Sequence, residues 1–406
     1  MSSTPTAPAP LSVAIDAYLR GNLQKADLLC RRLLQDEPQN TAAWLLLGRI
    51  AEQVGATTHA RNALHQARQT APGAEIHDIA PPPTPAPVHP RYLLIKAWGY
   101  GFCADLDHVY GGLLLAELTG RVPMVHWGHN SLFRDPDTDN AFEHFFEPVS
   151  GLTWNDLLAP QLSCFPAKWN TANLQRAEVS KWSGSGARLT GMYFLNRPEN
   201  VLVSDYHIKI NDLMPWIPPH HPLHGLQRHE LYRHLNEKYL RVKPALQARV
   251  DDLWQRHMAG RSWLAVHVRG TDKVEEINNL ADVNRAYDSR IDKILSVNPT
   301  LSIFLLTDSV DVVTQYRQRY GDRVVTLDCR RGSGTTGVHL EGQPSSALGE
   351  QVLTDMLMAS RCDFFLGNGG SNVSTAIRHL RNWAPGTYFL VGPDFLGSID
   401  LSLHEW

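Results

Sequence analysis

The sequence predicts an α/β protein with a doubly wound parallel sheet in its C-terminal half and a separate all-helical unit at its N-terminus. Short apolar runs alternate with helix-length segments after residue 250, and a repeat of 34 residues occupies residues 11–73. A proline-rich stretch separates the repeat from the rest of the chain. We therefore predict four segments: 1–78, helical repeats; 79–90, a linker; 91–250, a first sheet-containing domain; and 251–406, a second.

Composition excludes several classes of protein. The chain has 406 residues, of which 43% are hydrophobic, so it can form more than one core. Its net charge of −3 gives no general attraction for nucleic acid or an anionic membrane surface. The five cysteines show no paired spacing, which is typical of reduced thiols. No signal peptide and no membrane-length apolar run are recognisable, so the expected localisation is cytoplasmic.

The N-terminal repeat is visible by counting. Four pairs of residues are each separated by 34 positions: Gly21 and Gly55, Ala26 and Ala60, Leu33 and Ala67, and Pro38 and Pro72. This period, with small residues at helix crossings, resembles the tetratricopeptide repeat. Because two repeats bury their faces only against neighbours, we expect this unit to dock on the rest of the chain, self-associate or bind a protein. The prolines at residues 81–90 favour an extended, semi-rigid spacer.

The first sheet-containing domain begins with a predicted strand at residues 91–97. A glycine turn at residues 99–102 follows, and then a helix at residues 105–119 and a strand at residues 122–127. Strand, glycine turn and helix form the arrangement that brings backbone N–H groups to an anion, although tight packing explains such a turn equally well. Residues 128–240 show no clear periodicity.

The central strand of the second domain is predicted at the start of residues 263–273. This apolar run ends in a group of polar side chains: His267, Arg269, Thr271, Asp272 and Lys273. Ligands of open α/β sheets bind beyond the carboxyl ends of strands. A guanidinium there can hold phosphate oxygens in a fork, and an ammonium adds a point charge. The group is therefore predicted to bind a polyanion; the alternative is a solvated strand exit.

Further strands are predicted at residues 301–307, where Asp308 follows, at residues 323–327 and at residues 362–366. The last strand leads into a loop rich in glycine, serine and asparagine at residues 367–374. Such a loop, at the start of a helix, offers backbone donors and hydroxyl groups to phosphate. A plain glycine turn with a serine cap is the alternative.

The sequence contains two Asp-x-Asp pairs, a pattern that can hold a divalent metal ion. Asp105 and Asp107 fall in the first turn of a predicted helix, where carboxylates are favourable in any case. Asp137 and Asp139 fall in a loop rich in proline and asparagine. We therefore predict no bound metal.

Three segments together resemble one enzyme family. The stretches HVRGTDK (267–273), LLTDS (305–309) and residues 355–374 resemble the three motifs of the α1,6-fucosyltransferases of glycosyltransferase family 23. The resemblance covers roughly residues 91–400, whereas the His-x-Arg element alone is shared with α1,2- and protein O-fucosyltransferases. It implies a GT-B-like fold with a Rossmann-like GDP-sugar-binding domain at 251–406 and an acceptor-side domain at 91–250. It also implies GDP-fucose as donor substrate, inversion at the sugar, and no cofactor or metal.

The resemblance implies a donor site. His267 and Arg269 would bind the GDP diphosphate, and the Asp355 carboxylate would accept the N1–H and 2-amino donors of guanine. Ser371 corresponds to a phosphate-side serine and Phe102 to an aromatic residue near the base. The remaining predicted donor contacts are the neighbours of these residues in the two glycine-containing loops: Gly101, Gly370 and Asn372.

The catalytic assignments follow from the same motifs. Arg269 would stabilise the leaving diphosphate, Lys273 belongs to the same cationic group, and Asp308 corresponds to an acidic residue of the cleft. The family's glutamate base falls on Ile277, so Glu276 is the favoured general base and Glu275 the alternative.

One position departs from the α1,6 pattern, and the reaction retains alternatives. Gly270 stands where the α1,6 enzymes carry a second arginine, which leaves the linkage open. The acceptor can be a glycan or a protein hydroxyl. Two functions compete with this one. The first is a transferase that uses another GDP-sugar. The second is an adaptor that binds a GDP-sugar without turnover and uses its repeat unit to bind protein.

Overall fold

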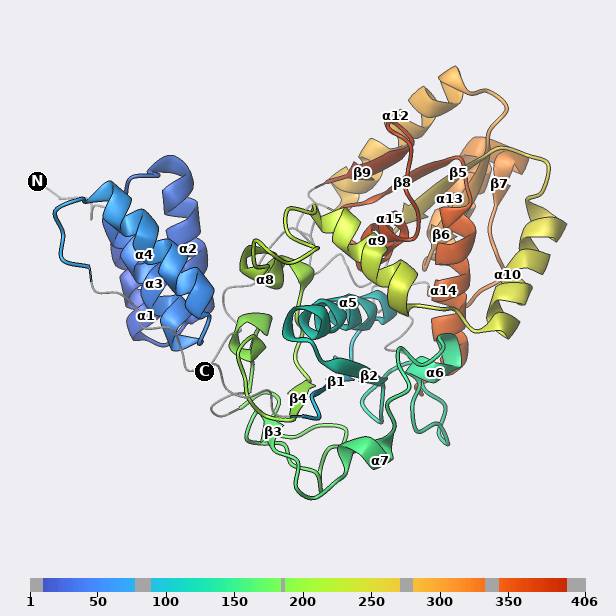
Figure 1. Ribbon diagram of the computed structural model, residues 1–406. Helices are drawn as coiled ribbons and strands as arrows, with labels where there is room; N and C mark the ends of the chain where they lie inside the picture. Colours follow the sequence, from blue (N-terminus) through green and yellow to red (C-terminus); the bar gives the residue numbers. More distant parts are fainter. Residues whose placement is uncertain (1–9, 77–88, 184–186, 271–279, 333–342, 393–406) are drawn as a thin grey trace, which may run out of the picture.

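In the computed structural model the described residues are 10–76, 89–183, 187–270, 280–332 and 343–392. They form an N-terminal helical unit and a mixed α/β body with two parallel sheets (Figure 1). The proline-rich linker lies largely at residues 77–88, outside this described part. The five cysteines are free thiols. In the described part of the chain, no helix combines the length and the apolar composition needed to cross a bilayer.

Four helices form the N-terminal unit: α1 (Pro10–Leu19), α2 (Leu23–Asp36), α3 (Thr41–Gln53) and α4 (Thr57–Thr70). The 34-residue repeat has a structural counterpart, because Gly21 and Gly55 each join the two helices of a pair. Their φ angles are 77° and 74°, in the left-handed region that glycine adopts without strain. Ala26 and Ala60 are both completely buried at the helix crossings.

The helical unit packs against the body through α8 (Ile210–Leu213) and the short helix η2 (Met214–Trp216). Gln24 donates a buried hydrogen bond of 3.2 Å to Asp212. The indole of Trp216 lies between two side chains of the unit: its ring is 5.1 Å from that of His59 and 5.4 Å from the Arg31 guanidinium. The unit therefore docks on the body, as expected for two repeats that bury their faces only against neighbours.

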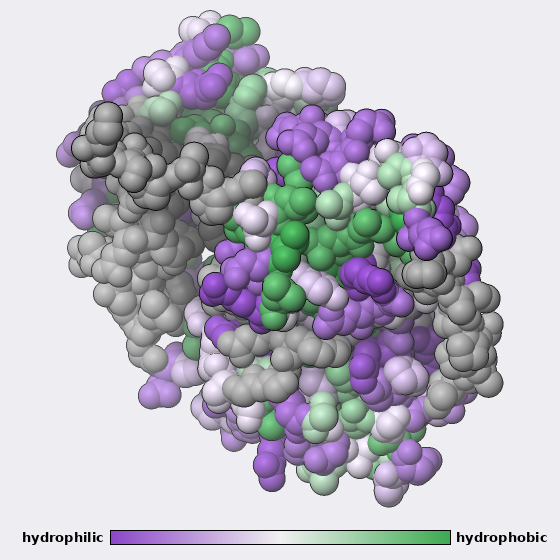
Figure 2. Space-filling model, turned by 90° about the vertical axis from the view of Figure 1, so that its left-hand side faces the viewer, coloured by the Kyte–Doolittle hydropathy of each residue, from purple (hydrophilic) through white to green (hydrophobic). Residues whose placement is uncertain are grey.

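Figure 2 views the molecule from the side that carries the helical unit, and hydrophobic areas lie there among hydrophilic ones. On α1, the side chains of Ile15 and Leu19 are 41% and 76% exposed. They are four residues apart and so share one face of the helix.

The first sheet consists of β1 (Tyr92–Lys96), β2 (Val122–His126), β3 (Cys164–Phe165) and β4 (Val201–Ser204). Its strands are parallel and their order is β2-β1-β4-β3. Helix α5 (Phe102–Thr119) joins β1 to β2 and contacts this sheet closely. A Cβ atom on Gly112 would lie 2.7 Å from the side chain of Ile95 in β1, and one on Gly111 would lie 2.0 Å from the carbonyl oxygen of Ile208 in the segment after β4.

The second sheet consists of β5 (Trp263–Val268), β6 (Ser302–Thr307), β7 (Val324–Val325), β8 (Phe364–Asn368) and β9 (Tyr388–Val391). These strands are parallel, in the order β7-β6-β5-β8-β9, and every residue of β5 is buried. The predicted doubly wound parallel sheet is thus confirmed. The longer helices of this part are α10 (Pro244–His257), α12 (Leu280–Val297), α13 (Val310–Tyr320), α14 (Ser346–Ser360) and α15 (Asn372–His379). The remaining elements are α6 (Phe142–Phe145), α7 (Trp154–Leu157), η1 (Gly191–Phe194), α9 (Arg228–Tyr239) and η3 (Gly321–Arg323).

Strand order identifies where ligands can bind. In the second sheet the chain leaves β5 toward β6 and leaves β8 toward β9, so the order reverses between the neighbours β5 and β8. In the first sheet β1 and β4 are neighbours, yet the chain leaves β1 toward β2 on the other side. Such breaks leave a crevice beyond the carboxyl ends of the two strands. Each sheet therefore has one expected binding crevice.

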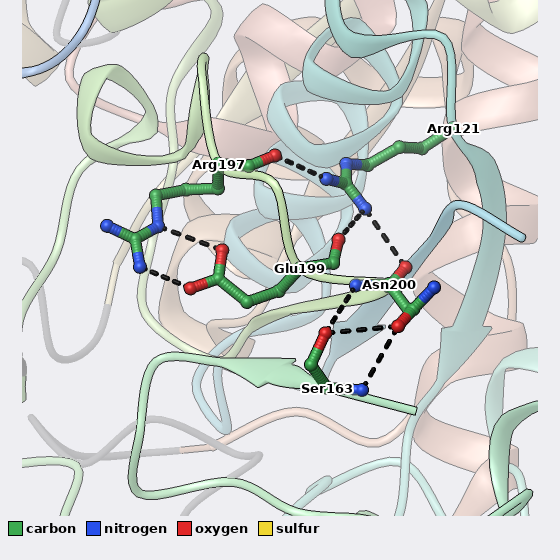
Figure 3. A network of polar contacts seen from close by, with 5 residues as sticks. All are labelled: Arg121, Ser163, Arg197, Glu199 and Asn200. Atoms are coloured by element: carbon green, nitrogen blue, oxygen red, sulfur yellow. Dashed lines mark hydrogen bonds and ion pairs between the residues drawn. The ribbon is translucent and has the colours of Figure 1, made fainter. Parts of the chain in front are cut away.

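A network at the opposite end of the first sheet holds its strands together (Figure 3). The buried Arg121 guanidinium donates to the carbonyl oxygens of Arg197, Glu199 and Asn200 at distances of 2.8–3.0 Å. It also donates to the carbonyl oxygen of Tyr92 at 3.3 Å. The side-chain oxygen of Asn200 accepts hydrogen bonds from Ser163, so one arginine connects the starts of β1, β3 and β4.

We expect Arg121→Met to destabilise the protein by about 3–5 kcal/mol, because it leaves several buried carbonyl groups without a donor. The loss is measured as the shift of the urea unfolding midpoint. Arg256→Met is the matched control, since Arg256 forms an ion pair with Asp252 in which both side chains are more than half exposed. Equal shifts for the two variants would show that Arg121 does not hold the sheet.

Candidate active site

An arginine–aspartate pair occupies the carboxyl ends of β5 and β6. Arg269 Nη1 lies 2.7 Å from Asp308 Oδ2, and the two side chains are 15% and 14% exposed. The other carboxylate oxygen of Asp308 accepts the backbone N–H of Gly270 at 3.0 Å. Asp308 therefore fixes both the guanidinium and the turn that follows β5. The sequence predicted both residues, but not that they form a pair.

The turn after β5 has no space for a side chain at residue 270. A Cβ atom on Gly270 would lie 2.5 Å from Cβ of Ser309, which begins α13 as its N-cap. A substituent there would displace the N-terminus of α13. Glycine at position 270, which departs from the α1,6 pattern, is thus explained by the lack of space for a side chain.

His267 is almost completely buried in β5. Its Nδ1 lies 2.7 Å from the hydroxyl oxygen of Ser374, which also accepts the backbone N–H of Asn368. Burial, with the nearby Arg269 charge, lowers the pKa of His267 to about 3. The imidazole is therefore neutral at pH 7, and of the two predicted diphosphate contacts only Arg269 carries positive charge.

The glycine-rich loop between β8 and α15 already uses part of its backbone donors. The N–H of Gly369 donates to the carbonyl oxygen of Val391, and that of Gly370 donates to the side chain of Asn368. Ser371 is the N-cap residue of α15, but its side chain forms no capping hydrogen bond. The predicted alternative of a simple serine cap therefore does not apply. The first-turn N–H groups of a helix lack intrahelical partners and suit an anion.

Two buried polar atoms accompany this helix terminus. Within the described residues, neither Oδ1 of Asn372 nor Nδ2 of Asn368 has a hydrogen-bond partner. Buried polar atoms normally have one. Both residues flank the loop, where a polar ligand would supply the missing contacts.

Asp355 lies on α14 between the buried residues Thr354 and Met356. Burial raises the pKa of its carboxyl to about 7, and the positive charge of Arg331 opposes this rise. Asp355 and Asp308 both raise the pKa of the Cys329 thiol, although burial is the larger cause. Asp355, predicted for the donor site, and Asp308, predicted for the cleft, are thus both near enough to Cys329 to affect its thiol. Sequence reasoning missed Arg331 because nothing in its local pattern marks it.

In the loop after β1, the side chain of Tyr100 is exposed and that of Phe102 is buried. Phe102 is only 2% exposed and packs edge-on against Trp127, Phe133 and Phe145. Its ring packs in the core, and its predicted place near the nucleotide base stays a prediction. Tyr100 is instead 47% exposed. Gly101 is the N-cap residue of α5.

The two aspartates at the start of α5 have structural partners. Asp105 accepts the backbone N–H of Gly99 at 2.8 Å, and burial raises its pKa to about 7. Asp107 contacts Nε2 of His207 at 2.8 Å and accepts a short hydrogen bond from Tyr232. The Tyr232 ring stacks on His379 of α15 at 3.6 Å. Asp107 thus links α5 to α9 and, through the stack of Tyr232 on His379, to α15. This role was not predicted because the partners of Asp107 come from distant segments.

The second pair, Asp137 and Asp139, lies in the loop before α6, and the backbone oxygen of Asp139 contacts His126 at 3.0 Å. Among the described residues no group of three histidine, cysteine, aspartate or glutamate side chains is arranged to hold a metal ion. Five predicted residues lie at 271–279, outside the described part of the chain: Thr271, Asp272, Lys273, Glu275 and Glu276.

Helix α14 brings the two sheets together near the site. Sγ of Cys103 lies 3.3 Å from Sδ of Met356, and Ser346 donates its backbone N–H to Asp135. Arg269 and Asp107 both influence the pKa of the Cys103 thiol, which burial raises. The start of α5 therefore lies against α14 at this contact.

Residues 224–380 match the family model of nodulation protein Z (NodZ). The match confirms the predicted resemblance. The NodZ-matching region contains β5, β6 and β8, and with them Arg269, Asp308, Asp355 and the loop before α15. No curated protein sequence matches the chain.

Several solved structures are similar to the chain. A NodZ α-1,6-fucosyltransferase soaked with GDP-fucose is 19% identical, with a TM-score of 0.45, over 72% of this chain and 93% of the other. The fucosyltransferase NodZ from Bradyrhizobium is 20% identical, with a TM-score of 0.44, over 71% and 92%. POFUT1 in complex with GDP-fucose is 14% identical, with a TM-score of 0.45, over 76% and 100%.

Proposed function

We propose that the protein is an inverting, metal-independent glycosyltransferase that moves L-fucose from GDP-fucose to a hydroxyl group of a glycan or protein acceptor. The main support is the position of Arg269. Asp308 holds its guanidinium at the carboxyl end of β5, where the strand order reverses. The NodZ family match over the same region supports the donor. On this proposal the body has a GT-B-like arrangement, and the helical unit is a tetratricopeptide-like module that binds protein through the exposed face of α1.

The reaction is a single displacement. The acceptor oxygen forms a bond to C1 of fucose while the bond between C1 and the diphosphate oxygen breaks, and GDP leaves with the electron pair. Charge on the departing diphosphate is stabilised by Arg269, by the N-terminus of α15 and by Lys273. Glu276 accepts the proton of the acceptor hydroxyl, with Glu275 as the alternative base.

The proposal assigns the remaining donor contacts as follows. His267 is neutral and acts as a hydrogen-bonding group rather than a charge. Ser371 and Asn372 begin α15, whose first-turn N–H groups meet the phosphate oxygens. Gly370 allows the backbone to approach, and Gly101 begins α5 on the opposite side of the crevice. Asp355 accepts the two donors of the guanine edge.

Asp355 makes the binding of GDP dependent on pH. Only the ionised carboxylate accepts both guanine donors, and its pKa without ligand is about 7. The affinity for GDP is therefore highest above pH 7 and decreases as the pH falls through this value. We expect the dissociation constant of GDP to rise about tenfold between pH 8 and pH 6. Calorimetric titrations at a series of pH values measure this change.

The matched control is Asp355→Asn, which has no titrating carboxyl. Asp355→Asn should bind GDP more weakly than the wild-type protein at pH 8. Its affinity for GDP should then change little between pH 8 and pH 6. Inosine diphosphate, which lacks the 2-amino group, should bind the wild-type protein more weakly than GDP does. An unchanged pH profile in Asp355→Asn would remove Asp355 from the guanine site.

A panel of GDP-sugars tests the function itself. The protein is incubated with GDP-fucose, GDP-mannose or GDP-glucose, with and without EDTA, and the release of GDP is followed with pooled acceptors. The proposal predicts that GDP-fucose gives the fastest turnover and that EDTA changes neither turnover nor GDP affinity. A tenfold loss on chelation would contradict the metal-free reaction. Binding of GDP without turnover of any sugar would favour the adaptor.

A further inference from the structure

Two exposed aromatic side chains touch each other on the acceptor-side domain. Large apolar side chains with high exposure are few in the described part of the chain, and the aromatic ones are Tyr100 and Trp182, at 47% and 46%. Their ring centroids are 6.4 Å apart, with the planes at 78°. Exposed aromatic rings that form a contiguous surface mark an interaction site more often than scattered apolar residues do.

The exposed pair rests on buried rings. Trp98, which is 8% exposed, lies 4.9 Å from Tyr100 and 5.4 Å from Trp182, measured between ring centroids. Tyr206 packs edge-on against Trp98 at 4.6 Å and against Trp182 at 5.9 Å. We call these four residues, Trp98, Tyr100, Trp182 and Tyr206, the aromatic platform.

A buried lysine fixes the platform in position. Lys181 is 4% exposed, and its ammonium group donates a short hydrogen bond to the carbonyl oxygen of Trp98. The same nitrogen lies 4.5 Å from the Trp98 ring and 5.6 Å from the Trp182 ring. Cation–π contacts of this kind hold ring orientations. The two exposed rings are therefore supported from below, as expected of a preorganised binding site.

The aromatic platform lies at the crevice of the first sheet. Trp98 and Tyr100 follow β1, and Tyr206 follows β4, the neighbouring strands where the order breaks. Asp105 holds the loop between them by accepting the N–H of Gly99. The platform continues into Gly101, at the N-terminus of α5, which the proposed function places beside the donor.

Polar groups border the aromatic platform. His207 lies 5.9 Å from Trp98 between ring centroids and is held by Asp107 at 2.8 Å. Asp205, which precedes Tyr206 in the chain, forms an ion pair of 2.6 Å with Lys168, and the two side chains are 7% and 10% exposed. Flat aromatic faces with fixed polar groups at their edge suit a ligand that is apolar on one face and carries hydroxyl groups around its rim.

We infer that the aromatic platform binds a sugar ring of the acceptor, which makes the acceptor a glycan rather than an unglycosylated polypeptide. The C–H groups on one face of a pyranose carry partial positive charge and meet the negative face of an aromatic ring. Its hydroxyl groups reach the polar border at His207 and at the Lys168–Asp205 pair. This inference rests on the proposed function, because it assigns the acceptor of the same reaction.

The test separates acceptor binding from donor binding. The full-length protein, saturated with GDP, is applied to an array that carries neutral and acidic oligosaccharides together with unglycosylated peptides. We expect binding to oligosaccharides. Trp182→Ala and Tyr100→Ala should each weaken binding to the same oligosaccharides roughly tenfold or more, as for a central aromatic anchor. Trp182→Phe should retain part of the affinity, and the affinity for GDP should stay at the wild-type value.

Val297→Ala is the control for loss of an exposed apolar side chain elsewhere, since Val297 is 75% exposed at the end of α12. It should change none of these values. The inference is overturned by binding to peptides alone, by an absence of binding to any oligosaccharide, or by unchanged oligosaccharide binding in Trp182→Ala. A loss of GDP affinity in Trp182→Ala would make the platform part of the nucleotide site instead. Release of fucose from GDP-fucose without acceptor tests the donor reaction independently of all these results.

Discussion

Replacement of Glu276 by glutamine is expected to lower kcat about 10²–10⁴-fold while the affinity for GDP stays nearly unchanged. General-base catalysis typically contributes this factor. The acceptor hydroxyl is a weak nucleophile unless a carboxylate accepts its proton, and glutamine keeps the size of the side chain without that capacity. Steady-state kinetics at saturating GDP-fucose measure kcat, and calorimetry measures the affinity for GDP.

Glu275→Gln and Asp308→Asn are the matched controls. Both oxygens of Asp308 are engaged, one with Arg269 and one with the N–H of Gly270. Asp308→Asn should therefore change donor affinity, through the orientation of Arg269, more than it changes kcat. Wild-type kcat in Glu276→Gln together with a large loss in Glu275→Gln would move the base by one residue. The same loss in Asp308→Asn would make Asp308 the base.

Arg269→Ala is expected to weaken GDP binding by about 2–5 kcal/mol, or roughly 30- to 4,000-fold, because it removes a charged fork from a largely buried site. The variant should also lower kcat, since the same guanidinium stabilises the leaving diphosphate. Calorimetric titration of GDP measures the first effect and GDP release from GDP-fucose measures the second.

Part of this loss would arise from leaving the Asp308 carboxylate without its partner. The double variant Arg269→Ala/Asp308→Asn separates the two contributions, because it removes the unpaired negative charge. Arg269→Lys keeps the charge and loses the fork, so it should retain an intermediate affinity. Wild-type GDP affinity in Arg269→Ala would exclude this arginine from the diphosphate site.

The second sheet was predictable because its strands are buried on both faces. Such strands are continuous apolar runs, and β5 extends over six buried residues that the sequence marks plainly. Arg269 and Asp308 follow directly on two of these runs, so their place at the carboxyl edge of the sheet follows from topology alone. The same reasoning places Ser371 and Asn372 at the start of α15.

Contacts between distant segments could not be predicted. Arg121 binds carbonyl groups that come from two other parts of the chain, and nothing near Arg121 indicates this. The burial of Phe102 has the same origin. A phenylalanine in a glycine loop suggests a ligand contact, but its burial depends on Trp127 and Phe145, which the sequence does not bring near it.

The chemistry of His267 and Gly370 also depends on tertiary contacts. A histidine at a strand end suggests a cation for phosphate, yet burial holds its pKa far below neutral pH. The N–H of Gly370 suggests an anion contact, yet Asn368 already accepts it. At both positions the residue type suggests a place in the site, and its environment decides which atom is available to a ligand.

We expect the donor in the crevice between β5 and β8 and the acceptor in the crevice between β1 and β4. A crystal structure of the protein with GDP locates the nucleotide directly. The diphosphate should lie against Arg269 and the N-terminus of α15, with the guanine edge on Asp355. A nucleotide stacked on Tyr100 and Trp182, without contact to Arg269, would exclude this arrangement.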